Sequence, residues 1–259
     1  MIVIKFGGHV MDDATDESRD RNLAWMREIA QRWRDGERFV VVHGGGPQID
    51  QQLKAEGVEF EFRDGYRMTT PKVMKVVEAV LTGSVLRSVV SSLRSAGLPA
   101  VGITGSDAGL LEVSLKDGGV LGLVGQVDAV NPQVLHSLIN SGFFPVVAPV
   151  SNALDGQALN VNADLAAGAI AGALAAKEAL FMTDVPGIYR SWPDENSLIS
   201  EITVGELGSM AFEGGMVPKV AAVINAITSG AKSARVIDGR SLSAFQDALQ
   251  GKGGTWVRA

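Results

Sequence analysis

The sequence has no cysteine and only three histidines among its 259 residues. The absence of cysteine excludes disulfides, thiolate metal ligands and a cysteine nucleophile, and it is compatible with a reducing compartment. His9, His43 and His136 are too few and too scattered to predict a histidine-rich metal site. Any binding or catalysis must therefore depend on other polar residues.

Long hydrophobic runs and an excess of basic charge are also lacking. The apolar stretch Leu165–Ala176 is shorter than the roughly 20 residues that span a bilayer. The N-terminal MIVIKFGG is interrupted at Lys5 and does not resemble a signal peptide. With a formal net charge of −6, no overall positive field attracts nucleic acid or anionic membrane. We predict a cytoplasmic protein that binds neither.

Apolar runs that predict strands alternate with segments whose apolar residues recur at helical spacing. The predicted strands cover residues 2–6, 38–43, 98–103, 143–150, 179–185, 234–238 and 255–258, and the predicted helices cover residues 16–35, 71–96, 132–141, 162–176 and 218–229. Residues 110–115 and 120–127 flank a Lys-Asp-Gly-Gly turn and predict an antiparallel hairpin. The alternation favours an α/β protein with a mostly parallel sheet covered by helices on both faces.

Two glycine-rich turns follow predicted strands, Gly7-Gly8 and Gly44-Gly45-Gly46. Neither matches GxxxxGK[ST] or GxGxxG, so the two familiar nucleotide-binding motifs are absent there. Glycine still lets backbone N–H groups approach an anion, and Pro47 suits the first turn of a helix whose N-terminus would favour one. Taken alone, the glycines fit an anion site and two plain tight turns equally well.

Two lysines favour the anion site. Lys5 lies within an apolar strand beside the first glycine pair, where a buried ammonium group needs an anionic partner. Lys219 follows Pro218 near the start of a predicted helix, the end that disfavours a cation unless an anion is near. The plain alternatives are an edge strand with Lys5 in solvent and a solvated Lys219. We interpret the two as charges directed at a phosphoryl group.

Further polar residues occur at the ends of predicted elements. Asn160, Asn162 and Asp164 crowd a helix start, where one of them can be the N-cap and the others can bind substrate or orient the lysines. Arg67 can clamp a carboxylate bidentately, although a surface arginine is the plain alternative. Asp184 follows a strand and can cap, turn the chain or meet a nucleotide. No histidine or carboxylate pair stands out as a general base.

These residues belong to a series of short motifs in a specific order. They read IKFGG, VVHGGGPQI, GYRMT, VGITGSDAGLL, GFFPVVAPV, LNVNADLAAGAIAGAL, MTDVPGIY, GGMVPKV and ARVIDGR, and they span almost the whole chain. In this order the chain resembles the amino acid kinase family, and within it the N-acetylglutamate kinases. The resemblance implies an αβα sandwich with a mostly parallel central sheet and two lobes. Residues 1–174 would bind the acyl amino acid and form a homodimer, and residues 175–259 would bind ATP.

The resemblance also implies a reaction. The γ-phosphoryl group of ATP, with Mg²⁺, would pass to the side-chain carboxylate of N-acetyl-L-glutamate, the second step of arginine biosynthesis. Such a transfer needs positioning and charge stabilisation more than covalent chemistry, and a carboxylate is already ionised at neutral pH. The apparent lack of a general base is therefore expected. Phosphates and water would hold most of the Mg²⁺, so no dedicated metal cage is predicted.

Roles for single residues follow from the same resemblance. Lys5 and Lys219 would neutralise the transferring phosphoryl group and also contact the nucleotide, Asp164 would hold both lysines, and Asp184 would lie at the nucleotide. Gly8, Gly45 and Gly46 would donate backbone hydrogen bonds to the phosphoryl group, with Gly45 also near the acceptor, and Arg67 and Asn160 would bind the acceptor.

Two alternatives stay open at this point. A kinase of the same family that acts on aminoadipate or glutamate linked to a carrier protein would share most of the motifs. A non-catalytic sensor or partner protein on this fold is a second alternative, although all three charged residues of the phosphoryl site are present. Because the chain begins directly at its first predicted strand, we expect a dimer without strong inhibition by arginine.

Overall fold

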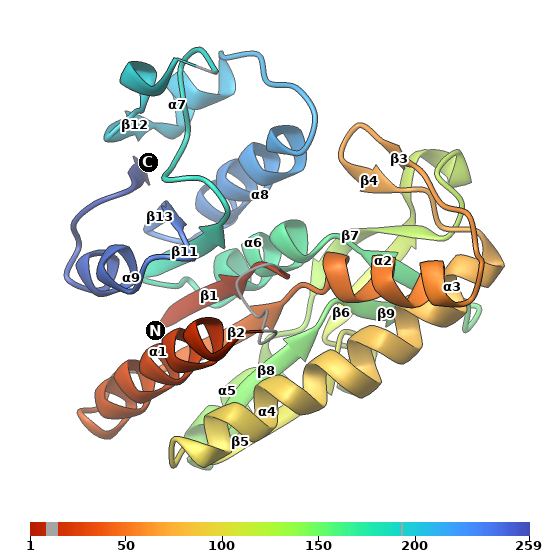
Figure 1. Ribbon diagram of the computed structural model, residues 1–259, viewed down its shortest axis with the longest axis horizontal. Coiled ribbons are helices and arrows are strands. Elements are labelled where there is room, and N and C mark those ends of the chain that lie inside the picture. Colours follow the sequence, from red (N-terminus) through yellow and green to blue (C-terminus); the bar gives the residue numbers. More distant parts are fainter. Residues whose placement is uncertain (9–14, 193) are drawn as a thin grey trace.

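The computed structural model describes residues 1–8, 15–192 and 194–259, and its centre is an eight-stranded sheet (Figure 1). In spatial order the strands are β12 (Glu201–Thr203), β14 (Thr255–Arg258), β13 (Ser233–Asp238), β11 (Glu178–Thr183), β1 (Ile2–Phe6), β2 (Phe39–His43), β8 (Phe144–Ala148) and β5 (Ala100–Thr104). All neighbours pair in parallel except β13 and β14. The predicted α/β class with a mostly parallel sheet is therefore confirmed.

Helices cover both faces of this sheet, as the alternating segments predict. One face carries α1 (Asp16–Arg34), α2 (Gly46–Ala55), α3 (Pro71–Glu78), the π-helical segment η1 (Ala79–Val85), α4 (Leu86–Ser95) and α9 (Leu242–Leu249). The other carries α5 (Gln133–Asn140), α6 (Ala163–Ala173), α7 (Val204–Gly208) and α8 (Met216–Thr228). The result is a three-layered αβα sandwich.

The side chains of β1 show how the two faces are divided. Ile2, Ile4 and Phe6 belong to the apolar core under α1 and α9, whereas Val3 belongs to the core under α6 and α8. Successive side chains in a strand point to opposite faces, so Lys5 projects on the same side as Val3. The sequence thus directs one ammonium group into the layer between the sheet and α6.

Smaller sheets lie beside the central one. A four-stranded sheet has the order β6 (Leu111–Leu115), β7 (Val124–Val130), β10 (Ala158–Val161), β9 (Val150–Asn152), and a short hairpin pairs β3 (Phe62–Arg63) with β4 (Tyr66–Arg67). Three short turn segments are η2 (Asp107–Gly109), η3 (Lys116–Gly119) and η4 (Glu195–Ser197), of which η2 and η3 include residues with left-handed backbone angles. Figure 1 shows the hairpin β3–β4 and the four-stranded sheet at the same end of the molecule.

Most predicted elements are confirmed, and the differences have local causes. The predicted strand 143–150 divides at Pro149 into β8 of the large sheet and β9 of the smaller one, which the sequence run did not reveal. The elements β10, β12, α7 and α9 were not predicted, because they are short or weakly periodic. The division of the chain after residue 174 stays a prediction, since the central sheet continues from β1 into β11 without a break.

Candidate active site

Lys5 occupies a central position in the large sheet. Its strand β1 lies between β2 and β11, so the alternative of an edge strand is wrong. The residue is 8% exposed, which is unusual for a lysine and requires a charged partner.

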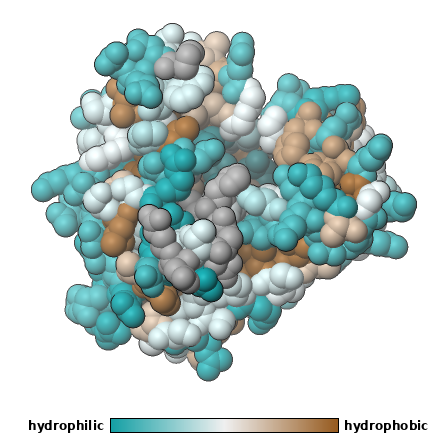
Figure 2. Space-filling model, in the orientation of Figure 1, coloured by the Kyte–Doolittle hydropathy of each residue, from teal (hydrophilic) through white to brown (hydrophobic). Residues whose placement is uncertain are grey.

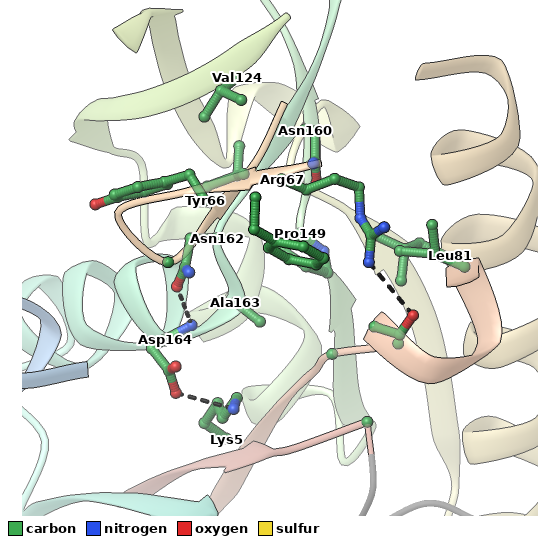
Figure 3. Close-up of a pocket in the computed structure, with 18 residues that line it drawn as sticks. Lys5, Tyr66, Arg67, Leu81, Val124, Pro149, Asn160, Asn162, Ala163 and Asp164 are labelled. Carbon is green, nitrogen blue, oxygen red and sulfur yellow. Dashed lines mark hydrogen bonds and ion pairs between the residues drawn. The ribbon is translucent and has the colours of Figure 1, made fainter. Parts of the chain in front are cut away.

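The partner is Asp164 in the first turn of α6. Asn162 is the N-cap of this helix, because its side-chain oxygen accepts from the backbone N–H groups of Asp164 and Leu165. Lys5 Nζ lies 2.9 Å from Asp164 Oδ1, and Lys219 Nζ lies 3.3 Å from Asp164 Oδ2. One buried carboxylate therefore holds two lysines that are far apart in the sequence, and Figure 3 shows the Lys5–Asp164 contact.

Close packing of α6 on α8 brings Lys219 to this position. Gly168 in α6 lies against the backbone of Ala222 in α8, where a side chain would collide with the carbonyl group. Lys219 lies near the start of α8 and is 9% exposed, so the alternative of a solvated lysine is also wrong.

The three side chains carry an excess of positive charge. Burial alone would raise the pKa of the Asp164 carboxyl group, but the charges and hydrogen bonds of Lys5 and Lys219 lower it to about 2. Burial lowers the pKa of Lys5, which Asp164 opposes and the charge of Lys219 reinforces. Two ammonium groups on one carboxylate leave one uncompensated positive charge, which an anion would stabilise.

The glycine turns lie directly beside these charges. A Cβ atom on Gly8 would be 2.6 Å from Pro47 Cδ and 2.9 Å from the backbone nitrogen of Gly46. The turn after β1 therefore needs glycine to pack on the start of α2. Gly8, Gly45 and Gly46 all line the same pocket as Lys5 and Asp164, so the predicted turns converge as the parallel strands require.

Arg67 and Asn160 lie at the opposite end of this pocket, as Figure 3 shows. Thr69 connects them: Asn160 Nδ2 donates to Thr69 Oγ1 at 3.1 Å, and Thr69 Oγ1 donates to the Arg67 carbonyl at 2.8 Å. Arg67 is 7% exposed, so the alternative of a surface arginine is wrong. The pocket thus has a cationic group at each end.

Asp184 lies in a neighbouring pocket rather than in this one. That pocket is lined by Asp184, Lys219, Trp192 and Phe212, among others, and its volume is about 760 Å³ compared with about 190 Å³ for the first. Lys219 lies at the junction, since it lines the larger pocket and contacts Asp164 of the smaller one.

Apolar side chains that reach the surface also mark the two pockets. Much of the face in Figure 2 is hydrophilic, with apolar side chains in separate groups. Phe62 and Trp192 are 55% and 66% exposed, and they line the smaller and the larger pocket respectively. A large apolar side chain beside a polar cavity is typical of a ligand site.

Some residues of the site were not predicted from the sequence. Asp50 contacts Arg67, whereas Phe62 and Tyr66 line the smaller pocket. Asp50 lies one turn after the glycines on α2, which is the signal that could have placed it nearby.

Neither a metal cluster nor a membrane helix is found in the part of the chain that the structure describes. Within residues 1–8, 15–192 and 194–259, no three histidine or acidic side chains gather as metal ligands. Over the same residues, no helix combines the length and apolar character needed to cross a bilayer. Both oxygens of Asp164 lie within ion-pair distance of a lysine. The carboxylates that line the larger pocket are those of Asp184 and Glu213.

A comparison with known families agrees with this geometry. The model of the amino acid kinase family matches residues 1–238. The chain belongs to the amino acid kinase family. It is 44% identical to the acetylglutamate kinase of Kineococcus radiotolerans, over 93% of this chain and 83% of that protein. It is 42% identical to the acetylglutamate kinase of Prochlorococcus marinus strain NATL1A, over 95% of this chain and 83% of that protein.

Solved structures of other proteins share the fold. The crystal structure of smu.665 from Streptococcus mutans UA159 superposes with a TM-score of 0.79 at 25% identity, covering 100% of this chain and 98% of that chain. Carbamate kinase from Giardia lamblia, bound to AMP-PNP, superposes with a TM-score of 0.73 at 21% identity, covering 99% and 97%. The amino acid kinase fold implied by the sequence motifs is thus confirmed.

Proposed function

We propose that the protein is an ATP-dependent acetylglutamate kinase, which phosphorylates the side-chain carboxylate of N-acetyl-L-glutamate to give N-acetyl-L-glutamyl 5-phosphate. The main support is the smaller pocket, whose two cationic ends suit an acceptor with two carboxylates. Arg67 lies at one end, and Lys5 with Asp164 lies at the other. Acetylglutamate kinases that are 41–44% identical over more than nine-tenths of the chain support the same acceptor.

The acceptor would lie between these ends. Arg67 would bind its α-carboxylate, and Asn160 would bind near the N-acetyl group through hydrogen bonds. The side-chain carboxylate would then face Lys5 and the glycine turns. Because this carboxylate is ionised at neutral pH, it attacks without a general base.

The phosphoryl group would come from ATP in the larger pocket. A carboxylate oxygen of the acceptor bonds to the γ-phosphorus while the bond from that phosphorus to the β–γ bridging oxygen breaks, and ADP leaves with the electron pair. Lys5 and Lys219 would neutralise charge on the group in transfer, and Gly8, Gly45 and Gly46 would donate backbone hydrogen bonds to it. Asp164 would keep both ammonium groups in place.

Magnesium would accompany the nucleotide. Asp184 and Glu213 line the larger pocket, which fits a cation held mainly by phosphate and water with few protein ligands. When bound, the ion would neutralise charge on the phosphates. The homodimer, the cytoplasmic location and the role in arginine biosynthesis stay predictions.

The proposed function can be tested by measuring ADP release with a panel of acceptors. The panel contains N-acetylglutamate, N-acetylaminoadipate, aspartate and free glutamate, and hydroxylamine trapping detects the acyl phosphate as a hydroxamate. We expect N-acetylglutamate to give the highest kcat/KM. No turnover of any free acceptor would contradict the proposal and favour a carrier-linked substrate, and tight ATP binding without turnover would favour a sensor.

A further inference from the structure

Arg67 is held from several sides before any substrate is considered. Its Nη2 atom lies 2.6 Å from Asp50 Oδ1 and donates to the Gly46 carbonyl at 3.4 Å, a contact drawn in Figure 3. Its guanidinium carbon lies 4.8 Å from the ring centre of Phe60 and 4.6 Å from that of Phe62. Cation–π contacts of this kind restrict the plane of the guanidinium group.

The other terminal nitrogen of Arg67 makes no hydrogen bond within the protein. Among the described residues, Nη1 of Arg67 is buried and has no hydrogen-bond partner. Such a donor is costly unless a ligand satisfies it. Arg67, which lines the smaller pocket, thus uses only one of its two terminal nitrogens in contacts with Asp50 and Gly46.

Asp50 and Gly46 belong to the same helix. Gly46 is the first residue of α2 and lines the pocket beside Lys5, and Asp50 lies one turn later with its side chain 33% exposed. Arg67, in contrast, belongs to the β3–β4 hairpin, a two-stranded sheet that pairs with no other strand among the described residues. The ion pair between Asp50 and Arg67 therefore connects this hairpin to the helix that begins at the glycine turn. Backbone hydrogen bonds of Thr69 attach the end of the hairpin to Leu121 and Leu123 instead.

We propose that Asp50 is a positioning residue that sets the distance between the carboxylate-binding end and the phosphoryl end of the pocket. By fixing that distance, it selects acceptors by the number of methylene groups between their two carboxylates. This inference rests on the proposed function, because it assumes an acceptor that reaches from Arg67 to Lys5. Asp50 itself does not line the smaller pocket, so it would touch neither the acceptor nor the reacting atoms.

A purely structural role for Asp50 makes a different prediction. If the carboxylate only neutralised a buried arginine, its loss would weaken the fold and lower the activity towards all acceptors alike. A role in spacing instead changes the preference between N-acetylglutamate and N-acetylaminoadipate, which differ by one methylene group. The ratio of kcat/KM for these acceptors therefore separates the two roles.

The test compares the wild type with Asp50→Ala, Asp50→Asn and Glu56→Gln. For Asp50→Ala we expect the KM for N-acetylglutamate to rise about tenfold and the preference over N-acetylaminoadipate to fall about fivefold, because a misplaced anchor loses orientation. The KM for ATP should change less than about twofold, since Asp50 does not line the larger pocket. Asp50→Asn keeps an acceptor oxygen and should give a smaller shift in the same direction.

Glu56→Gln is the matched control. Glu56 lies at the end of the same helix, is exposed and accepts a hydrogen bond from Gln52, so the change removes one acidic charge from α2 without touching Arg67. Its kinetics should equal those of the wild type. In an Arg67→Ala background, Asp50→Ala should add no further loss, because the two residues act as one unit.

The outcomes distinguish the inference from the proposed function. A wild type that does not phosphorylate N-acetylglutamate overturns the proposed function. An active wild type with an Asp50→Ala variant of unchanged acceptor preference overturns only the role of Asp50. If Asp50→Ala does not fold, the preference of Asp50→Asn decides, and an unchanged value there overturns the inference as well.

Discussion

Two groups of buried charges share the central sheet, and they differ in how their charges balance. Lys5, Asp164 and Lys219 meet near the C-terminal end of β1 as two cations on one anion. Glu178 and Arg235 meet near the N-terminal end of β11 as one cation on one anion, 3.3 Å apart, with side chains 13% and 4% exposed.

The second group is also more completely hydrogen-bonded within the protein. Arg235 Nη1 donates to the Gly253 carbonyl at 2.6 Å, and Ser233 Oγ donates to Glu178 Oε2 at 3.5 Å. Neither Glu178 nor Arg235 lines the smaller or the larger pocket, and the adjoining Gly253 is itself a hydrogen-bond partner of Arg235. A neutral and satisfied pair is typical of structure, whereas an unbalanced group beside glycine turns is typical of an anion site. Burial of charge alone does not separate the two cases.

The largest expected effect is on kcat, and it comes from removing one of the two cations that contact Asp164. Lys5→Met removes one cation, keeps most of the side-chain volume and leaves Asp164 paired with Lys219. We expect kcat to fall by about a thousandfold, because charge stabilisation in the transition state is lost. The free energy of unfolding should stay equal or rise, since a buried charge is removed. Steady-state kinetics and urea denaturation measure both, and the exposed Lys252→Met is the control. Wild-type turnover in Lys5→Met would contradict the assigned role.

Arg235→Leu should have the converse effect. It leaves Glu178 buried without its cation, and we expect a loss of about 3 kcal/mol in the free energy of unfolding. The kcat of the folded enzyme should stay within about twofold, because the pair lies at the other end of the strands. Arg258→Leu breaks an ion pair with Glu201 whose side chains are 49% and 50% exposed, and should cost less than about 1 kcal/mol. If Arg235→Leu and Arg258→Leu lose equal free energy of unfolding, burial of the ion pair does not determine how much its loss destabilises the fold.

The smallest effect is the pH dependence of the free energy of unfolding. Protonation of Asp164 destabilises the folded state, whereas protonation of Glu178 favours it. The pKa of Asp164 falls from 3.8 to about 2 on folding, so its contribution is complete above pH 4 and is lost as the pH falls towards 2. The size of this contribution is about 2 kcal/mol. Burial raises the pKa of Glu178, although Arg235 opposes it, so protonation of Glu178 favours the folded state.

Urea denaturation between pH 5 and pH 2 measures this difference. Asp164→Asn should be less stable than the wild type at pH 5, because its two lysines lose their anion, and its stability should fall less steeply towards pH 2. In Glu178→Gln the free energy of unfolding should still fall as steeply towards pH 2 as in the wild type. An unchanged slope in Asp164→Asn would show that Asp164 is not the group that titrates.

The sequence was more informative about where the strands lie than about which side chains contact one another. The apolar run IVIKF predicted a buried strand with one charged side chain, and the structure confirms both. Asn162 was one of three candidate N-caps, and only the position of its oxygen singled it out. Asp50 could not be paired with Arg67 from the sequence, because the contact depends on how the β3–β4 hairpin lies against α2.

The sequence by itself determined the layers of the fold and the kinds of residue available for an anion site. Periodicity and turn chemistry are local properties, so strands, helices and glycine turns can be predicted from short segments. Only the tertiary structure places Lys5 and Lys219 on the carboxylate of Asp164. It also places Arg67 and Asp184 in different pockets. Those contacts depend on the packing of α6 on α8 and on strand order, which side chains distant in the sequence establish together.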